Sequence, residues 1–156
     1  MPFLIDGHNL IPKMGLSLRN VNDEQELIER LQEFCRLENC QVEIYFDGAP
    51  AGQAGTRKLG RVSAHFIRLG NTADNAIRLR LHQLGASAKN WTVVTSDRSV
   101  QTEARAVHAQ VMSSEAFARL VAATSQKSEK SREKPEKVDE AEVQEWLDVF
   151  RQGKRS

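Results

Sequence analysis

The sequence contains few cysteines and no long apolar segment. Only Cys35 and Cys40 occur among its 156 residues, with no second pair and no histidine run beside them, so nothing supports a zinc site. We expect buried free thiols in a reducing cytoplasm. No apolar run approaches the roughly 20 residues that span a bilayer, and the N-terminus lacks the basic and apolar segments of a secretory signal. We therefore expect a cytoplasmic protein without a membrane partner.

Two common nucleotide-binding patterns are also missing. The chain contains no Gly-x-x-x-x-Gly-Lys-Ser/Thr, so an ATPase or GTPase P-loop is not supported, and no Gly-x-Gly-x-x-Gly.

Its length suits one domain with a short appendage, and 40% apolar with 28% charged residues is typical of a soluble globular protein. The net charge of +1 conceals residues 57–80, where six basic residues accompany a single acid, Asp74. Such a patch is compatible with a polyanionic substrate, and also with an ordinary solvated surface.

The chain does contain apolar, β-forming segments that each end in an aspartate. The segments are residues 3–5, 42–46 and 91–95, and the acids that follow them are Asp6, Asp47 and Asp97. Asp74 joins them in the first turn of a helix that Thr72 is predicted to cap. Each aspartate alone is explained by a turn or by the helix dipole. In open α/β sheets, however, strand carboxyl ends and helix N-termini share one edge, where ligands bind. The four acids together therefore predict a site.

The remaining pattern predicts an α/β fold. We predict further strands over residues 61–69 and 109–112, helices over 23–37, 72–84, 100–107 and 114–123, and exposed loops over 7–22 and 49–60. Asn22 and Ser99 are the predicted caps of the first and third helices. Strand, helix and strand in succession imply right-handed βαβ units and a parallel sheet.

Composition divides the chain into three predicted parts. Residues 1–124 form the domain that carries the acids, residues 125–138 form a charged linker or helical extension, and residues 139–156 form an amphipathic C-terminal helix with a basic tail. The apolar stripe of this last helix consists of Val143, Trp146, Leu147 and Phe150. It suits packing on the same domain, docking of a partner or a dimer, so the oligomeric state stays open.

Several carboxylates close together need a cation to compensate their charge. Hard oxygen ligands select Mg²⁺ or Mn²⁺ rather than zinc. Such an ion flanked by basic residues points to phosphate-ester hydrolysis through a metal-activated water. We expect Asp6, Asp74 and Asp97 to hold the metal. Asp47 is expected to act as a ligand through water or as a base, and Asn9 to orient a water or a phosphate.

Basic side chains near these acids are candidate substrate contacts. Arg57 and Lys58 lie in a predicted small, flexible loop whose cationic end suits capture of a phosphate backbone. Arg78 and Arg98 are expected to contact substrate phosphates. His8 is a candidate acid or base, although a loop histidine bonded to the backbone explains it as well.

Four short motifs together resemble the YacP-like NYN domain family, within the PIN-like nuclease superfamily. They are Phe-Leu-Ile-Asp-Gly-His-Asn at 3–9, Phe-Asp-Gly at 46–48, Thr-Ala-Asp-Asn at 72–75 and Thr-Ser-Asp-Arg at 95–98, and the resemblance covers roughly residues 1–124. The C-terminal Glu-Trp-Leu-Asp-Val-Phe also resembles the tail of that family. The resemblance implies a Rossmann-like PIN/NYN fold with about five parallel strands flanked by helices, Mg²⁺ or Mn²⁺, and endoribonuclease activity. It implies metal-binding roles for Asp6, Asp74 and Asp97, with Asn9 and Asp47 in support, and it allows cleavage of mRNA on the ribosome.

Our leading prediction is therefore a metal-dependent endoribonuclease acting on RNA. The main alternative is a non-catalytic RNA- or ribosome-binding module on the same fold, for which basic residues 56–58 would matter more than the acids. A phosphatase is a weaker alternative, because the Asp-x-Asp pattern of the haloacid-dehalogenase type is broken by His8. The YacP-like motifs and tail argue against a PIN toxin that needs an antitoxin.

Overall fold

The structure is a computed structural model that describes residues 1–16 and 21–138. Its contacts divide the chain into two compact units, Met1–Val121 and Ala122–Ser156. The first unit contains the sheet and the predicted site. In the second, the described part is the continuation of one long helix to Val138. The predicted C-terminal helix at 139–156 lies outside the described residues.

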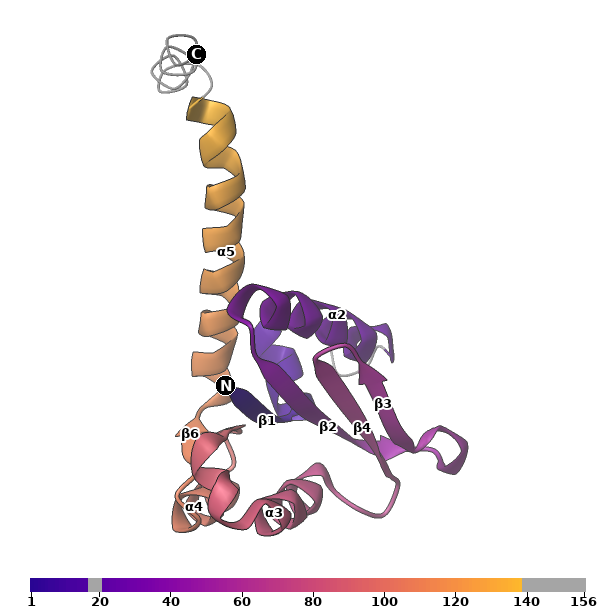
Figure 1. The fold of residues 1–156 in the computed structure, drawn as a ribbon. Helices are drawn as coiled ribbons and strands as arrows, with labels where there is room; N and C mark the ends of the chain where they lie inside the picture. The colour runs from indigo at the N-terminus through magenta and orange to yellow at the C-terminus, as the bar shows by residue number, and fades with distance from the viewer. Residues whose placement is uncertain (17–20, 139–156) are drawn as a thin grey trace. The chain divides into compact units, whose positions relative to one another are not determined.

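A six-stranded sheet forms the centre of the first unit (Figure 1). Its order is β3-β4-β2-β1-β5-β6, and the strands are β1 Pro2–Asp6, β2 Gln41–Ala49, β3 Gly55–Leu59, β4 Val62–Arg68, β5 Thr92–Val94 and β6 Gln110–Met112. All neighbours are parallel except β3, which pairs antiparallel with β4. The α/β class is confirmed. The predicted five parallel strands are confirmed as β4, β2, β1, β5 and β6. The exposed loop predicted over residues 49–60 is corrected, because β3 lies there and pairs antiparallel with β4 as an edge strand.

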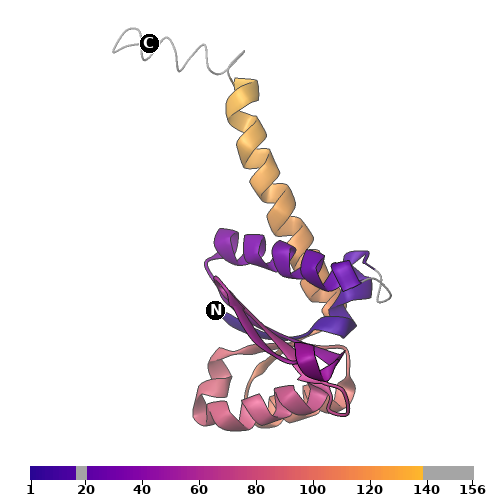
Figure 2. The same ribbon diagram turned by 90° about the vertical axis from the view of Figure 1, so that its right-hand side faces the viewer.

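Helices cover both faces of the sheet. They are α1 Gly7–Leu10, α2 Val21–Glu38, α3 Ala73–Leu84, α4 Arg98–Ala106 and α5 Ser114–Val138, with 3₁₀ turns at Ile11–Met14, Ala51–Gln53 and Gly85–Asn90. Figure 2 shows α2 on one side of the sheet and α3 and α4 on the other. Within the described residues, no helix combines the length and apolar character needed to cross a membrane.

The helix ends correct three predictions. The loop predicted over residues 7–22 contains α1, which begins directly after β1. Asn22 lies inside α2, because that helix already includes Val21. Asp97 rather than Ser99 caps α4, since the Asp97 side chain accepts from the Ser99 and Val100 amides. The predicted Thr72 cap of α3 is confirmed, with Thr72 Oγ1 accepting from Asn75 N at 3.1 Å.

Two apolar clusters hold the sheet between its helices. Because side chains alternate along a strand, β1 directs Phe3 and Ile5 toward α2 and Leu4 toward α3. On the α2 side, the Phe3 ring packs against Phe34 and Phe117 at centroid distances of 6.0 and 5.2 Å. The buried stripe predicted for the first helix is confirmed, because Leu27, Leu31 and Phe34 are all core residues. The cysteines are buried and unpaired, as predicted.

Candidate active site

The predicted acids gather at the carboxyl edge of the sheet. Asp6 ends β1, and Asp47 lies near the end of the neighbouring strand β2. Asp97 follows β5 and caps α4, while Asp74 occupies the first turn of α3. The carboxyl groups of Asp6 and Asp74 are within hydrogen-bonding reach of each other, and those of Asp74 and Asp97 are as well. The three predicted metal-binding acids thus form a continuous row.

Asp6 is the most enclosed of these acids, at 9% exposed. It caps α1 by accepting from Asn9 N at 3.4 Å. Burial, followed by the negative charge of Asp74, raises the pKa of Asp6 to about 7 from its ordinary 3.8. Near neutral pH, and with no cation bound, Asp6 therefore retains much of its proton and donates it to Asp74.

Asp97 has the opposite environment. Its Oδ1 accepts from the Ser99 hydroxyl at 2.7 Å, from Ser99 N at 2.8 Å and from Val100 N at 3.3 Å. The Ser99 hydroxyl contributes most to lowering the pKa of Asp97, and the backbone amides add to it. For Asp74, burial and then the charge of Asp97 raise the pKa. The row therefore joins a protonated acid to an ionised one and carries negative charge that a cation would compensate.

Asp47 contacts histidine rather than the row itself. His8 Nδ1 lies 2.9 Å from Asp47 Oδ1, and His8 Nε2 lies 2.6 Å from Glu24 Oε2. These contacts raise the pKa of His8, with the Glu24 hydrogen bond contributing most. The expectation of a histidine bonded to the backbone is wrong, because both ring nitrogens face carboxylates. Glu24 is a partner that the sequence does not predict, since nothing in its local sequence links it to His8.

Asn9 is committed to contacts within the protein. Its Oδ1 accepts from Ser96 N at 2.9 Å and from the Ser114 hydroxyl at 2.6 Å. These bonds fasten α1 to the segment immediately before Asp97 and to the start of α5. The geometry therefore gives Asn9 a position beside the acids and a clear means of holding Asp97 in place.

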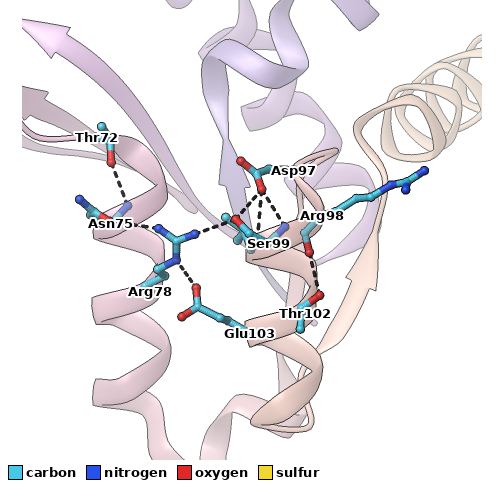
Figure 3. A network of polar contacts seen from close by, with 9 residues as sticks. Thr72, Asn75, Arg78, Asp97, Arg98, Ser99, Thr102 and Glu103 are labelled. Carbon is cyan, nitrogen blue, oxygen red and sulfur yellow. Dashed lines mark hydrogen bonds and ion pairs between the residues drawn. The ribbon is translucent and has the colours of Figure 1, made fainter.

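The predicted arginine contacts divide into two kinds. Arg78 lies in a polar network between α3 and α4 (Figure 3). It donates to Asn75 Oδ1 at 3.1 Å and to Ser99 Oγ at 2.8 Å, and it pairs with Glu103 through Nε. Arg98 is exposed and extends away from Arg78 in the same view. Arg98 is thus free to face solvent, whereas Arg78 links the two helices that carry Asp74 and Asp97.

Arg57 and Lys58 lie on the edge strand β3, which places them on opposite faces of the sheet. Arg57 pairs in register with Ala64 and lies 5.1 Å from the centre of the Phe66 ring. Lys58 pairs with Ser63, on the other face. Both are exposed. They do not form the single mobile cationic tip that the predicted loop would have offered.

The carboxylates fit a hard divalent cation in their chemistry. Among residues 1–16 and 21–138, no group of three or more His, Cys, Asp or Glu side chains is arranged to hold a metal ion. Mg²⁺ is often bound through one or two carboxylates, waters and substrate phosphates. The proton-sharing contact of Asp6 with Asp74 offers two such carboxylates, and replacing that proton by a cation relieves their repulsion.

A mostly parallel α/β sheet with acids along its carboxyl edge is typical of nuclease-type domains of the NYN and PIN-like class, whose members generally depend on a divalent metal. The chain belongs to the YacP-like NYN domain family, whose sequence profile matches residues 3–152. The predicted resemblance is confirmed.

Two solved structures share this fold. The crystal structure of Rae1 (YacP) from Bacillus subtilis has a TM-score of 0.65 and 22% identity, over 98% of this chain and 95% of that chain. Its W164L mutant has a TM-score of 0.62 and 24% identity, over 83% of this chain and 79% of that chain. No curated protein matches the chain.

Proposed function

We propose that the protein is a metal-dependent endoribonuclease in which Asp6, Asp74 and Asp97 hold Mg²⁺ or Mn²⁺. The observation that carries this proposal is the continuous row of these three carboxylates at the carboxyl edge of the sheet. Holding like charges close together destabilises a fold, so their juxtaposition favours a functional role.

The chain's residues would divide the work as follows. When bound, the cation would lower the pKa of a water and stabilise the leaving oxygen of a phosphodiester. Ser99 keeps Asp97 ionised and available as a ligand. Asn9 positions the segment before Asp97. Asp47 accepts from Ala73 N at 3.5 Å and so supports the helix end that carries Asp74.

The proposed substrate is RNA, including mRNA, and the exposed Arg57, Lys58 and Arg98 are the candidate phosphate contacts. Family membership supports an RNA substrate at the coarse level. Association with the ribosome is part of the proposal, and the cleavage assay tests it directly. The two buried free thiols, Cys35 and Cys40, fit a cytoplasmic setting.

The test is cleavage of labelled mRNA, free and on ribosomes, with Mn²⁺, Mg²⁺ or EDTA. Asp97→Asn is the test variant, because asparagine caps a helix as well as aspartate does and leaves α4 intact. Glu29→Gln, an exposed carboxylate on α2, is the matched control. We expect metal-dependent cuts that Glu29→Gln retains and that Asp97→Asn reduces about 100-fold or more. Unchanged metal-dependent cleavage by Asp97→Asn would overturn the assignment.

A non-catalytic RNA-binding module is the second candidate. It is favoured by the lack of a preformed metal-ligating group within the described residues. This alternative predicts RNA binding that EDTA does not change and no cleavage with any metal, free or on ribosomes. It also predicts that Lys58→Ala weakens binding while Asp97→Asn does not.

A further inference from the structure

A groove of about 380 Å³ lies on the face of the sheet that α3 covers. Its floor comes from strands β2 and β4 and its wall from α3. Its lining includes Glu43, Tyr45, His65, Leu79, Arg80 and Gln83. None of them belongs to the proposed metal-binding set.

Strand register fixes where this groove lies relative to Asp6. Asp6 is the register partner of Tyr45, and Tyr45 is the register partner of His65. Partners in parallel strands share a face, and neighbouring strands lie about 4.8 Å apart. Asp6, Tyr45 and His65 therefore form one row across three strands, and the Cα of His65 lies roughly 10 Å from that of Asp6, measured across the sheet. A nucleotide whose phosphate lies at the acids can span this distance and place its base at His65.

The floor contains two aromatic rings that stack on each other, and one ring nitrogen lacks a hydrogen bond within the described residues. The Tyr45 and His65 rings stack at 4.6 Å between centroids and 13° between planes. His65 Nδ1 is bonded to Thr56 Oγ1 at 2.9 Å. Its Nε2 is buried and makes no hydrogen bond to any residue that the structure describes. A buried nitrogen of this kind needs a partner, and a ligand in the groove can supply it.

The wall combines an apolar side chain with a neutralised charge. Leu79 is 60% exposed on α3 and lines the groove. Arg80 donates to both carboxylate oxygens of Glu43 at 2.9 Å and lies 5.3 Å from the centre of the Trp91 ring. Because Glu43 balances its charge, Arg80 makes the groove a poor site for a phosphate and leaves it suited to an uncharged planar group.

We propose that this groove binds one unpaired nucleobase of the RNA, beside the phosphodiester held at the acids. Single-stranded RNA is recognised by stacking on aromatic side chains and by hydrogen bonds to base edges. Leu79 and the face of the His65 ring that Tyr45 does not cover supply the stacking surface. His65 Nε2 and the exposed Gln83 supply edge contacts. The inference rests on the proposed function only for the position of the cleaved bond.

The first test is RNA binding in EDTA, where no cleavage intervenes. Anisotropy of a labelled single-stranded oligoribonucleotide gives the Kd for the wild-type chain, His65→Ala, Leu79→Ala and Leu69→Ala. Leu69 is 73% exposed and lies outside the groove, so it is the matched control. We expect His65→Ala to weaken binding about fivefold or more and Leu79→Ala to weaken it in the same direction. Thermal unfolding of His65→Ala checks its fold, and the exposed Leu79 gives an independent variant.

The second test asks whether the groove reads one base. Oligonucleotides that each lack a single base are compared with the intact one. We expect one abasic position to weaken wild-type binding about fivefold or more and to have no further effect on His65→Ala. If an abasic position weakens wild-type binding but not His65→Ala binding, and no condition gives cleavage, the groove is a base-binding site and the nuclease assignment is refuted. If the protein cleaves RNA with metal, and every abasic position weakens binding equally in the wild-type protein and in the His65 and Leu79 variants, the base-binding role of the groove is refuted and the nuclease assignment stands.

Discussion

The pKa values of Asp6 and Asp97 shift in opposite directions because the surroundings of the two carboxyl groups differ. Asp6 is enclosed and faces Asp74, so its pKa rises to about 7. Asp97 accepts three hydrogen bonds from Ser99 and Val100, with the Ser99 hydroxyl as the leading cause of its lowered pKa. An enclosed acid that resists ionisation opposes folding near neutral pH. Such a cost is expected at a site selected for function rather than stability.

Replacing Asp6 by asparagine is therefore expected to stabilise the metal-free protein at pH 8. The pKa of Asp6 is 3.8 ordinarily and about 7 in the fold. Between these values the folded state binds more protons than the unfolded state, so stability falls as pH rises through this range. The asparagine side chain carries no such charge and still caps α1. Urea unfolding should show a gain of about 1–3 kcal/mol for Asp6→Asn at pH 8, which vanishes below pH 4.

Asp97→Asn is the matched comparison for this effect. Because the Ser99 hydroxyl lowers the pKa of Asp97, ionisation there favours the folded state, and the variant should gain no stability at pH 8. Millimolar Mn²⁺ should raise the Tm of the wild-type protein at pH 8 more than that of Asp6→Asn, since a cation favours the ionised acids. Equal gains for both variants in urea, or equal Tm shifts for the wild-type protein and Asp6→Asn, would contradict a raised pKa at Asp6.

The sequence could predict the acids but not most of their partners. Asp6, Asp47 and Asp97 each follow a β-forming segment, and topology alone brings such residues to one edge. Ser99 was within reach of prediction, because an aspartate two residues before a serine often bonds its hydroxyl or amide. Glu24 contacts His8 only because α2 packs beside α1, and no local sequence pattern predicts that contact.

At the scale of elements, the sequence predicted the parallel strands and missed the edge strand. Residues 55–59 begin with glycine and threonine and include two adjacent basic residues, a composition typical of loops. They form β3 because β4 supplies a partner for their backbone along five register pairs. α1 was missed for a similar reason. Four residues are too few to show helical periodicity.

The close approach of α1 to β2 requires glycine at position 7. A Cβ there would lie 2.4 Å from Phe46 Cε1 and 3.0 Å from the Tyr45 carbonyl oxygen. The Phe46 ring is buried and stacked on Phe66 at 5.4 Å, so it cannot move aside freely. We expect Gly7→Ala to lower the free energy of unfolding by about 1–3 kcal/mol.

Gly52→Ala is the control for that substitution, because no atom lies within 4 Å of a Cβ at position 52. Its unfolding free energy should change by no more than about 0.5 kcal/mol. Chemical denaturation of both variants measures the difference. A Gly7→Ala protein as stable as Gly52→Ala would show that Phe46 has room to move.

The link between α3 and α4 gives Arg78 a role that differs from phosphate binding. Its bonds to Asn75, Ser99 and Glu103 hold together the helix ends that carry Asp74 and Asp97. Arg78→Ala should therefore lower kcat about tenfold while KM changes little.

Arg98→Ala is the matched substitution, because Arg98 is exposed and extends away from this network. It should weaken RNA binding and reduce the slope of log Kd against log salt by about 1, as expected for the loss of one phosphate contact. An equal loss of salt slope for Arg78→Ala would show that Arg78 binds phosphate after all.

At the scale of the whole molecule, the start of α5 belongs to the core of the first unit. Phe117 is fully buried, and its ring packs 5.2 Å from Phe3 and 5.4 Å from Phe34. Ser114 donates to Asn9, beside the acids. The first compact unit ends at Val121, and the domain boundary near residue 124 stays a prediction.

A chain of residues 1–124 should therefore unfold cooperatively and keep metal-dependent cleavage of free RNA. A chain of residues 1–113 lacks Phe117 and Ser114 and should fail to fold, because the loss of a buried phenylalanine alone costs about 3–5 kcal/mol of a typical total of about 5–15 kcal/mol. Phe117→Ala in the full chain isolates that contribution from the deletion. Circular dichroism melts and RNA cleavage with Mn²⁺ measure both outcomes. Loss of folding in the 1–124 chain would place the boundary further along α5, and a stable 1–113 chain would show that Phe117 contributes little to the core.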